Sequence, residues 1–469
     1  MRAACWSNES ADTTPLRIRN HKAEKHLRPS FVAVDHPLPA SIRKPIWSNF
    51  AGKRVLLLQG PVGGFFRRVA AALEANNVQC VRKLNFNGGD WWFFRSGDNY
   101  TGTLAEWPAY LIAYIERHRI NTLVLYGDCR PIHRTAVAHA RQRGLACWVF
   151  EEGYVRPNHV TFEKHGVNGY SVLAEREPPI AKADTGGPPV APPPECEVGA
   201  TFGAAARRAI AYYIAGALAW PWFRHSVHHR PLRVLEGSAW VGGYWRKLLY
   251  RVRDRGVQEF LSTSASKRYF LAPLQVAGDS QVHAHSSFDS VAEFLHTVVA
   301  SFAEHAPRDA LLVVKHHPMD RAYHDYTRVL RADARRHGLG NRLIYVHDLH
   351  LPTLLEHARG VVVINSTVGM SALQHGTAVV TLGRAIYDRP GLTYQGTLES
   401  FWLQAHEHAP DAHLFQAFRS HVIALTQLNG SFYKPLAEGD ESGLVVPSVV
   451  SHVPRHMASS SIPLIRVPQ

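Results

Sequence analysis

Cysteine is scarce in this chain of 469 residues, which has only five. No two of them form a CxxC pair. An odd, scattered set provides neither a disulfide framework nor the paired thiolates of a structural zinc site. We therefore expect reduced thiols and a cytoplasmic location. The five residues are Cys5, Cys80, Cys129, Cys147 and Cys196.

Long hydrophobic runs are also missing. The first twenty residues lack the apolar core of a signal peptide, so we expect no secretory signal. A membrane-spanning helix needs about 18 apolar residues, whereas the longest candidate, residues 209–223, is shorter and interrupted by Pro221. Its aromatic rings and basic flanks favour a helix at an anionic membrane surface. The alternative is a buried helix that bridges two halves of the protein. The flanking arginines are Arg207, Arg208, Arg224, Arg230 and Arg233.

Acidic residues are outnumbered, because 52 Lys and Arg against 38 Asp and Glu give a formal net charge of +14. This bias favours anionic partners, such as a phosphorylated or carboxylated substrate or an anionic membrane. We do not expect nucleic acid among them. No helix-turn-helix, RRM, zinc-finger or KH signature is present, and the basic residues are interspersed rather than striped.

From Arg54 onward, short apolar runs alternate with helical patterns, which predicts an α/β fold with parallel, doubly wound sheets. Two Rossmann-like halves that face a central cleft, with a helical connector, are the layout of GT-B glycosyltransferases. The predicted parts are an N-terminal tail (1–50), a first half (51–175), a proline-rich linker with a helical connector (176–260), a second half (261–400), C-terminal helices (401–435) and a tail (436–469).

The loop "QGPVGG" follows the first predicted strand but does not fit a dinucleotide site. Gly60, Gly63 and Gly64 have the wrong spacing, Pro61 interrupts them, and Lys83 stands near where a ribose-binding acid is needed. The glycines would still allow an acceptor to approach the strand end closely. The alternative is a tight turn with no ligand.

The stretch "KLNFNGGD" follows the next strand and carries Asn85, Asn87 and Asp90. Their amides and carboxylate suit a polyhydroxylated acceptor, although NGG is also an ordinary turn sequence. Glu151 and Glu152 end a later strand of the same half. A carboxylate at a cleft rim is a candidate general acid or base; the alternative is an ion pair with a nearby arginine.

The second half carries two polar stretches at strand ends. In "LQVAGDSQ", Asp279 on a glycine turn is a candidate nucleophile or charge stabiliser, or simply an Asx turn, and Gln275 beside it is a candidate nucleotide-sugar-binding residue. In "VVKHHPMD", Lys315, His316 and His317 are candidate phosphate donors. Adjacent histidines of a strand point to opposite faces, so they do not form a simple metal site.

The stretch "VVVINSTVGMSALQHG" ends a strand and begins a helix. Asn365, Ser366 and Thr367 stand at this junction, where hydroxyls and free backbone N–H groups can hold an anion. A plain capped helix would look similar. The preceding Lys-His-His stretch favours a nucleotide-phosphate site.

These motifs, together with "EEGYVRPNHVTFEKHGVNGYS" and "GRAIYDRPGLTYQG…FW", resemble the KpsS/LipB family of capsular polysaccharide proteins from about Arg54 to Trp402. Members of that family are similar to retaining β-Kdo transferases of GT-B fold. The resemblance implies a Gram-negative enzyme that uses CMP-Kdo to build a poly-Kdo linker on a lysophosphatidylglycerol acceptor. It also implies peripheral association with the inner membrane, contact with other capsule biosynthesis and export proteins, and no cofactor or metal.

The resemblance also assigns roles to particular residues. Asp279 falls on the candidate nucleophile and Glu151 on the acid–base glutamate. His317 falls on the motif that contacts the CMP phosphate, and Ser366 and Thr367 on the nucleotide turn. The first half then binds the acceptor and the second half the CMP-sugar. The alternative is a non-catalytic export or assembly component that binds lipid-linked polysaccharide.

Overall fold

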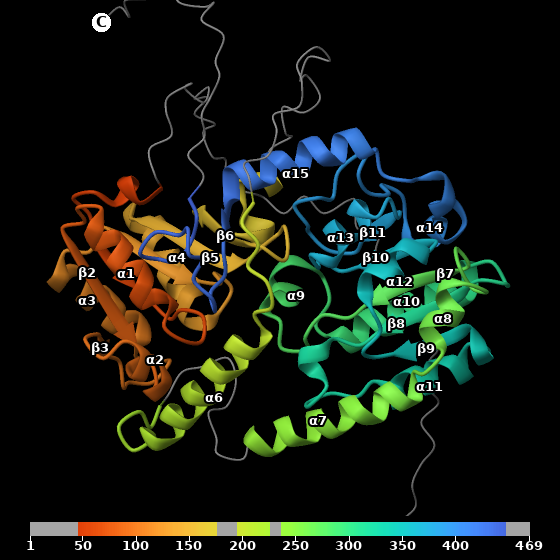
Figure 1. Ribbon diagram of the computed structural model, residues 1–469, viewed down its shortest axis with the longest axis horizontal. Helices are drawn as coiled ribbons and strands as arrows, with labels where there is room; N and C mark the ends of the chain where they lie inside the picture. The colour runs from red at the N-terminus through yellow and green to blue at the C-terminus, as the bar shows by residue number, and fades with distance from the viewer. Residues whose placement is uncertain (1–45, 176–194, 226–235, 447–469) are drawn as a thin grey trace, which may run out of the picture. The chain divides into compact units, whose positions relative to one another are not determined.

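A computed structural model describes residues 46–175, 195–225 and 236–446. The predicted N-terminal tail up to residue 45, most of the proline-rich linker (176–194), and residues 226–235 and 447–469 lie outside the described residues. Two β-sheets flanked by helices confirm the predicted α/β fold (Figure 1).

The first sheet has the strand order β12-β6-β5-β4-β1-β2-β3 within the described residues. Its strands from β5 to β3 pair in parallel, as the alternating pattern predicts. β6 runs antiparallel to both β5 and β12. The strands are β1 (Arg54–Leu57), β2 (Cys80–Asn85), β3 (Asp98–Asn99), β4 (Thr122–Tyr126), β5 (Ala146–Glu152), β6 (His159–Lys164) and β12 (Gln427–Asn429).

α1 and α3 of the first half each bury an apolar face. α1 begins directly after the glycine loop and packs Phe65, Val69 and Leu73 into the core. This spacing of three to four residues is that of an amphipathic helix. The helices are α1 (Phe65–Ala75), α2 (Gly88–Phe93), α3 (Trp107–His118), α4 (Pro131–Arg143) and α5 (Val172–Glu175).

The second sheet is parallel throughout, in the order β11-β10-β7-β8-β9. Its central strands are buried along their length, as expected for a sheet covered by helices on both faces. The strands are β7 (Tyr269–Pro273), β8 (Leu311–Lys315), β9 (Leu343–Val346), β10 (Gly360–Val363) and β11 (Val379–Thr381). The helices are α9 (Ser280–His285), α10 (Val291–His305), α11 (Thr327–Arg336), α12 (Leu351–His357), α13 (Val368–Gln374) and α14 (Leu398–Gln404).

Three helices form the described part of the connector, namely α6 (Phe202–Leu218), α7 (Glu236–Arg253) and α8 (Val257–Ser262). α6 packs against α2 of the first half. Across the described ranges, no helix combines the length and apolar character that crossing a bilayer requires.

The chain then returns to the first sheet through α15 (Ala412–Thr426), which leads directly into β12. α15 buries Phe415, Phe418 and Val422 in an apolar cluster that consists mainly of second-half residues and also includes Tyr154, Val155 and Leu173 of the first half. The predicted C-terminal helical segment therefore ends in a strand that pairs with β6. Each half thus has a sheet whose parallel strands end at a common carboxyl edge. The C-terminal segment formed by α15 and β12 contacts both halves.

Candidate functional site

The polar residues that follow β4 and β5 lie close together because carboxyl ends of parallel strands share one edge of a sheet. Asp128 and Cys129 follow β4, and Glu151 lies at the end of β5. The Cys129 thiol lies 3.2 Å from Asp128 Oδ1 and is buried. This edge of the first sheet therefore concentrates carboxylates around one buried thiol.

α9 of the second half contacts the same thiol. Cys129 Sγ lies 3.7 Å from His285 Nε2 and 3.8 Å from Gln281 Oε1. Burial raises the pKa of the Cys129 thiol, and the nearby charges of Asp128, Glu151 and Asp279 raise it further. Gln281 connects this thiol to a predicted catalytic carboxylate, because its backbone N–H donates to Asp279 while its side-chain oxygen lies near Cys129 Sγ.

Asp279 is held by amides at the start of α9. One carboxylate oxygen accepts a hydrogen bond from the backbone N–H of Gln281 (2.9 Å), and the other accepts one from Gln275 Nε2 (3.2 Å). Gln275 Nε2 also donates to Asn365 Oδ1 (2.9 Å). Burial raises the pKa of Asp279, while these hydrogen bonds act in the opposite direction. The Asx turn allowed by the sequence is therefore present, and it orients the carboxylate.

Glu151 and Glu152 differ in their surroundings. Burial raises the pKa of Glu151 to about 8, although the backbone N–H of Glu152 donates to it and Arg130 is nearby. Glu152 instead pairs with Arg156 at 3.9 Å and accepts a hydrogen bond from Tyr126 Oη at 3.4 Å. Of the two, Glu151 is the one whose charge acts on Cys129 at the junction with α9.

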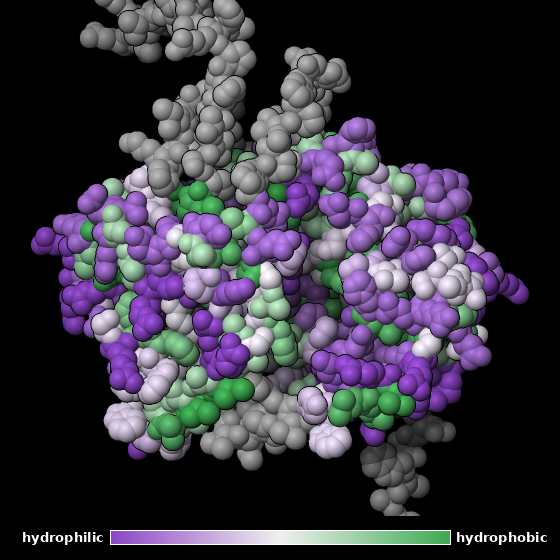
Figure 2. Space-filling model, viewed as in Figure 1, coloured by the Kyte–Doolittle hydropathy of each residue, from purple (hydrophilic) through white to green (hydrophobic). Residues whose placement is uncertain are grey.

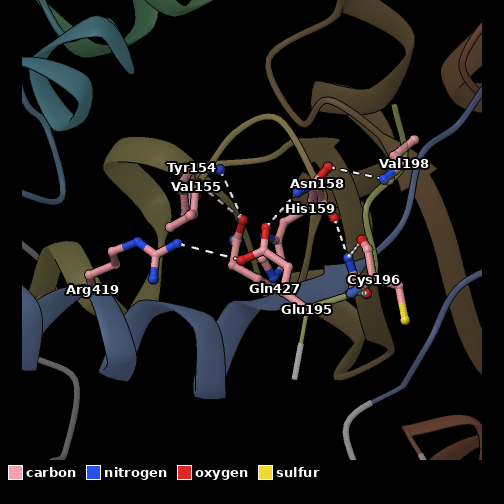
Figure 3. Close-up of polar contacts among 10 residues, drawn as sticks. Tyr154, Val155, Asn158, His159, Glu195, Cys196, Val198, Arg419 and Gln427 are labelled. Carbon is pink, nitrogen blue, oxygen red and sulfur yellow. Dashed lines mark hydrogen bonds and ion pairs between the residues drawn. The ribbon is translucent and has the colours of Figure 1, made fainter. Parts of the chain in front are cut away.

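The loop after Glu152 is fixed by the C-terminal segment (Figure 3). Gln427 Oε1 accepts hydrogen bonds from the backbone N–H groups of Tyr154 (3.0 Å) and Val155 (3.4 Å). Arg419 of α15 pairs with Glu195 at 3.7 Å. These contacts position the end of β5 from a segment more than 250 residues away.

The Lys-His-His stretch divides into two buried residues and one partly exposed residue. Lys315 Nζ donates to His347 O (3.2 Å), and burial lowers its pKa. His316 Nδ1 lies 2.7 Å from Tyr345 Oη, and burial lowers the pKa of this imidazole to about 4. His317 is partly exposed and accepts a hydrogen bond from the backbone N–H of Met319 (3.2 Å). Of the three, His317 is the one nearest to solvent.

The turn after β10 borders a pocket between the two halves. Ser366 Oγ accepts a hydrogen bond from the backbone N–H of Val368 (3.2 Å), and Asn365 Nδ2 donates to Gln281 O (3.1 Å). Sequence reasoning gave no role to most of the pocket-lining residues, although several belong to motifs that carry the family resemblance. The lining residues are Tyr154, Asn168, Asn365, Thr367, Met370, Arg384, Ala385, Ile386 and Tyr387.

Arg384 is the notable residue that the sequence did not single out. Its guanidinium donates to Gly169 O of the first half at 2.8 Å, and its backbone N–H donates to His285 O. It follows the short strand β11 on a glycine, and this strand-end position is the signal that could have identified it. Arg384 therefore connects the two sides of the pocket.

The predicted acceptor residues form an internal network. Asp90 accepts hydrogen bonds from Gln59 Nε2 (3.2 Å) and from Tyr212 Oη of α6 (2.8 Å), and Asn87 Nδ2 donates to Tyr212 Oη (2.8 Å). Asn85 Nδ2 donates to Phe94 O (3.1 Å). All three predicted side chains are buried, and Asp90 and Asn87 hold α6 in place.

The three glycines of the opening loop, Gly60, Gly63 and Gly64, are partly exposed. Gly63 has φ of +114°, and a Cβ there would lie 2.8 Å from Arg208 of α6. At Gly60 a Cβ would meet the Phe66 ring at 2.9 Å. The loop therefore needs glycine for its own packing, and its role toward an acceptor stays a prediction.

Among the residues that the structure describes, no three His, Cys, Asp or Glu side chains are grouped so that they could hold a metal ion. The expectation that catalysis needs no metal stays a prediction.

Comparison with known proteins gives consistent matches. The family described as capsule polysaccharide biosynthesis protein matches residues 121–433. The capsule polysaccharide export protein KpsS of Escherichia coli is 41% identical over 82% of this chain and 97% of its own length. The capsule polysaccharide modification protein LipB of Neisseria meningitidis serogroup A is 40% identical over 82% of this chain and 92% of its own length.

Among solved structures, KpsC of Thermosulfurimonas dismutans, a β-Kdo 2,7-transferase, aligns over 80% of this chain and 92% of that chain. The identity is 13% and the TM-score is 0.39. At this similarity the alignment bears on neither substrate nor activity.

Proposed function

This chain belongs to the KpsS/LipB family of capsule polysaccharide biosynthesis proteins, and on that basis we propose that it is a retaining β-Kdo transferase of GT-B type. Its donor is CMP-Kdo and its acceptor a lysophosphatidylglycerol-type lipid, on which it builds the poly-Kdo linker of a capsule. Its place of action is the cytoplasmic face of the inner membrane, where other capsule proteins are potential partners.

One observation carries the proposal. Asp279 lies at the start of α9, which contacts Cys129 of the first half, and Glu151 lies at the end of β5, next to the strand that leads to Cys129. Gln275 links Asp279 to Asn365, which lines the pocket. Two carboxylates on either side of a reacting sugar are what a retaining mechanism requires. The amide contacts of Asp279 support a nucleophile of fixed orientation.

The proposed reaction has two displacements. Asp279 attacks the anomeric carbon, and the bond to the CMP phosphate breaks with its electron pair leaving on CMP. The acceptor hydroxyl then attacks the same carbon and releases Asp279, while its proton passes to Glu151. His317, Ser366 and Thr367 would contact the departing phosphate. If Asp279 only stabilises positive charge on the sugar, no covalent intermediate forms.

The direct test is incubation of the protein with CMP-Kdo and lysophosphatidylglycerol, followed by mass spectrometry of the lipid. We expect additions of Kdo and release of CMP, with full activity in excess EDTA. Asp279→Asn should abolish transfer but keep CMP binding, because it removes charge with little change in volume. Transfer within about tenfold of wild type in this variant would overturn the nucleophile assignment.

The second candidate function is a non-catalytic export component, favoured by the name of the Escherichia coli relative, an export protein. It predicts binding of Kdo-bearing lipid without CMP release under any of these conditions. The variants His317→Ala and Ser366→Ala also distinguish the transferase from the export component. Under the transferase proposal each weakens CMP binding by about 1.5–3 kcal/mol, measured by calorimetry. Unchanged affinity in both variants would contradict the proposed nucleotide site.

A further inference from the structure

α6 has two apolar faces, and the first half covers only one of them. Tyr212, Ala215 and Ala219 are buried where α6 packs on α2. A second set of large apolar side chains recurs at multiples of four residues and is exposed by 48–78%. We call this set the α6 stripe; it consists of Phe202, Ile210, Ile214 and Leu218 of α6 and of Trp222, which lies in the turn after the helix.

α7 repeats this arrangement on the second half. Its buried face includes Tyr250, whose ring stacks on His347 at 3.5 Å. Asp254, the residue directly after α7, accepts a hydrogen bond from the His347 backbone N–H (2.8 Å). Its other face exposes large apolar side chains by 62–73%. This α7 stripe consists of Tyr244, Trp245, Leu249 and Val252. The predicted helical connector (176–260) contains both helices, but the sequence pattern indicates a membrane-surface helix only in the region of α6.

The sequence that carries both stripes is predominantly basic. Between positions 198 and 253 the sequence contains nine Lys and Arg residues and a single acidic residue, Glu236. Figure 2 shows apolar surface over α6 and α7 along the lower edge of the molecule in this view. Exposed aromatic and aliphatic side chains with cationic neighbours are the composition of a helix that lies in a membrane interface.

We propose that the α6 and α7 stripes bind the surface of an anionic phospholipid bilayer. The apolar side chains enter the boundary between headgroups and acyl chains, and the arginines and lysines contact lipid phosphates. Charge complementarity favours this occupant over a second copy of the chain. A twofold interface would place the same basic surface against itself, and such like-charge contact is unfavourable.

This proposal rests on the proposed function only in the reason it gives for membrane binding, which is that an enzyme that modifies a lipid must reach the bilayer. Vesicle binding itself can be measured without any transfer. The test is sedimentation of the full chain with phosphatidylcholine vesicles, with and without phosphatidylglycerol. We expect binding to the anionic vesicles at low salt and release as salt rises, since the Debye length falls to about 10 Å at 0.1 M.

Paired substitutions identify the surface. Ile214→Ser with Leu218→Ser on α6, and Trp245→Ser with Leu249→Ser on α7, should each remove most of the bound fraction. The matched control is Leu104→Ser with Leu403→Ser, which changes two side chains that are 46% and 53% exposed outside the stripes. Phe223 is left unchanged because it is buried. Thermal melts monitored by circular dichroism confirm that each variant is folded.

Three results would overturn the proposal. The wild type could stay in the supernatant with anionic vesicles, or folded stripe variants could bind as the wild type does. Sedimentation velocity could instead reveal a dimer that the stripe variants convert to monomer, which would make the surface a subunit interface. Transfer to a short-chain lysophosphatidylglycerol below its micelle concentration should survive in the stripe variants. If the protein binds vesicles but transfers no Kdo, the proposed function is rejected and the proposal of a membrane-binding surface stands.

Discussion

Glu151 and Glu152 are consecutive residues of β5, so their side chains leave the sheet on opposite faces. Glu151 lies near Gly127, Arg130 and Cys129. Glu152 instead contacts Tyr126 and the exposed Arg156. Chemical identity is the same at both positions, and only the face differs. This difference favours Glu151 as the acid–base residue.

The raised pKa of Glu151 predicts a pH-dependent effect on stability. Its folded pKa of about 8 exceeds the unfolded value of about 4.3. Stability linked to this group is therefore present below pH 4.3 and is lost as pH rises through 8. Glu151→Gln removes that loss. The melting temperature of the variant minus that of the wild type should therefore increase from pH 5 to pH 9. Glu152→Gln is the matched control and should not reproduce the gain. A constant difference for Glu151→Gln across this range would contradict the assignment.

Gln275 is expected to act through Asp279 rather than on substrate. Its amide donates to the Asp279 carboxylate and thereby lowers the pKa of that group. Gln275→Leu should reduce kcat and move the acidic limb of the pH–rate profile to higher pH, because an ionised Asp279 is required. Gln281→Leu is the control, since Gln281 contacts Asp279 through its backbone N–H. A shifted limb in the control, or none in Gln275→Leu, would reject this positioning role.

The α2–α6 contact explains why two glycines stand in "NGGD". At Gly89 a Cβ would lie 2.6 Å from the Tyr212 ring. That ring cannot easily move, because its hydroxyl is hydrogen-bonded to both Asp90 and Asn87. The motif that suggested an acceptor site in sequence thus also fixes the connector helix.

Gly89→Ala should therefore destabilise the protein by about 1–3 kcal/mol, the usual cost of overpacking. The measurement is urea unfolding followed by circular dichroism. Gly203→Ala in α6 is the matched control, because its Cβ would meet only Arg207 Nη1 at 3.7 Å. The control should be neutral or stabilising by up to about 1 kcal/mol. Equal effects of the two substitutions would contradict the tight contact.

Elements with a strong local pattern could be predicted from the sequence. "RVLLLQ" and "ALLVVKHH" contain the buried parallel strands β1 and β8, because apolar runs bounded by polar residues reflect burial on both faces. β12 could not be found this way, since Gln427–Asn429 is too short to carry a pattern and pairs with a strand 266 residues away. For α6, apolar residues occur around the whole helix. Only tertiary packing decides which face is buried.

In the candidate site, too, residues marked by a local sequence pattern could be predicted, and roles that depend on tertiary contacts could not. Asp279 and Asn365 could be predicted because each follows a strand of the parallel sheet, and such ends meet at one edge. The role of Arg384 could not be predicted from the sequence, because it depends on a contact with Gly169 across the junction of the halves. The internal partners of Lys315 and His316 also depend on the neighbouring strand β9 and the residues after it.

At the scale of the whole molecule, α15 and β12 join the two halves. α15 contributes Phe418 to a cluster of mainly second-half residues that also contains Tyr154 and Val155 of the first half, and the next element pairs with β6 of the first sheet. No residue separates Thr426, the end of α15, from Gln427, the start of β12. Loosening α15 should therefore loosen the outer strands of the first sheet, although they belong to the other half.

Phe418→Ala tests this coupling by hydrogen exchange and mass spectrometry. The substitution should cost about 3–5 kcal/mol, as for other buried phenylalanines, and should speed exchange in β6 and β12 as well as in α15. Phe294→Ala is the matched control, since Phe294 is equally buried but lies in α10, within a cluster confined to the second half. Its effect should remain in the second half, because local opening follows contiguous packed units. If Phe418→Ala leaves β6 and β12 unchanged, the halves open independently and the C-terminal segment does not transmit stability between them. Acceleration of β6 by both variants would instead indicate a single cooperative unit, in which α15 has no special role.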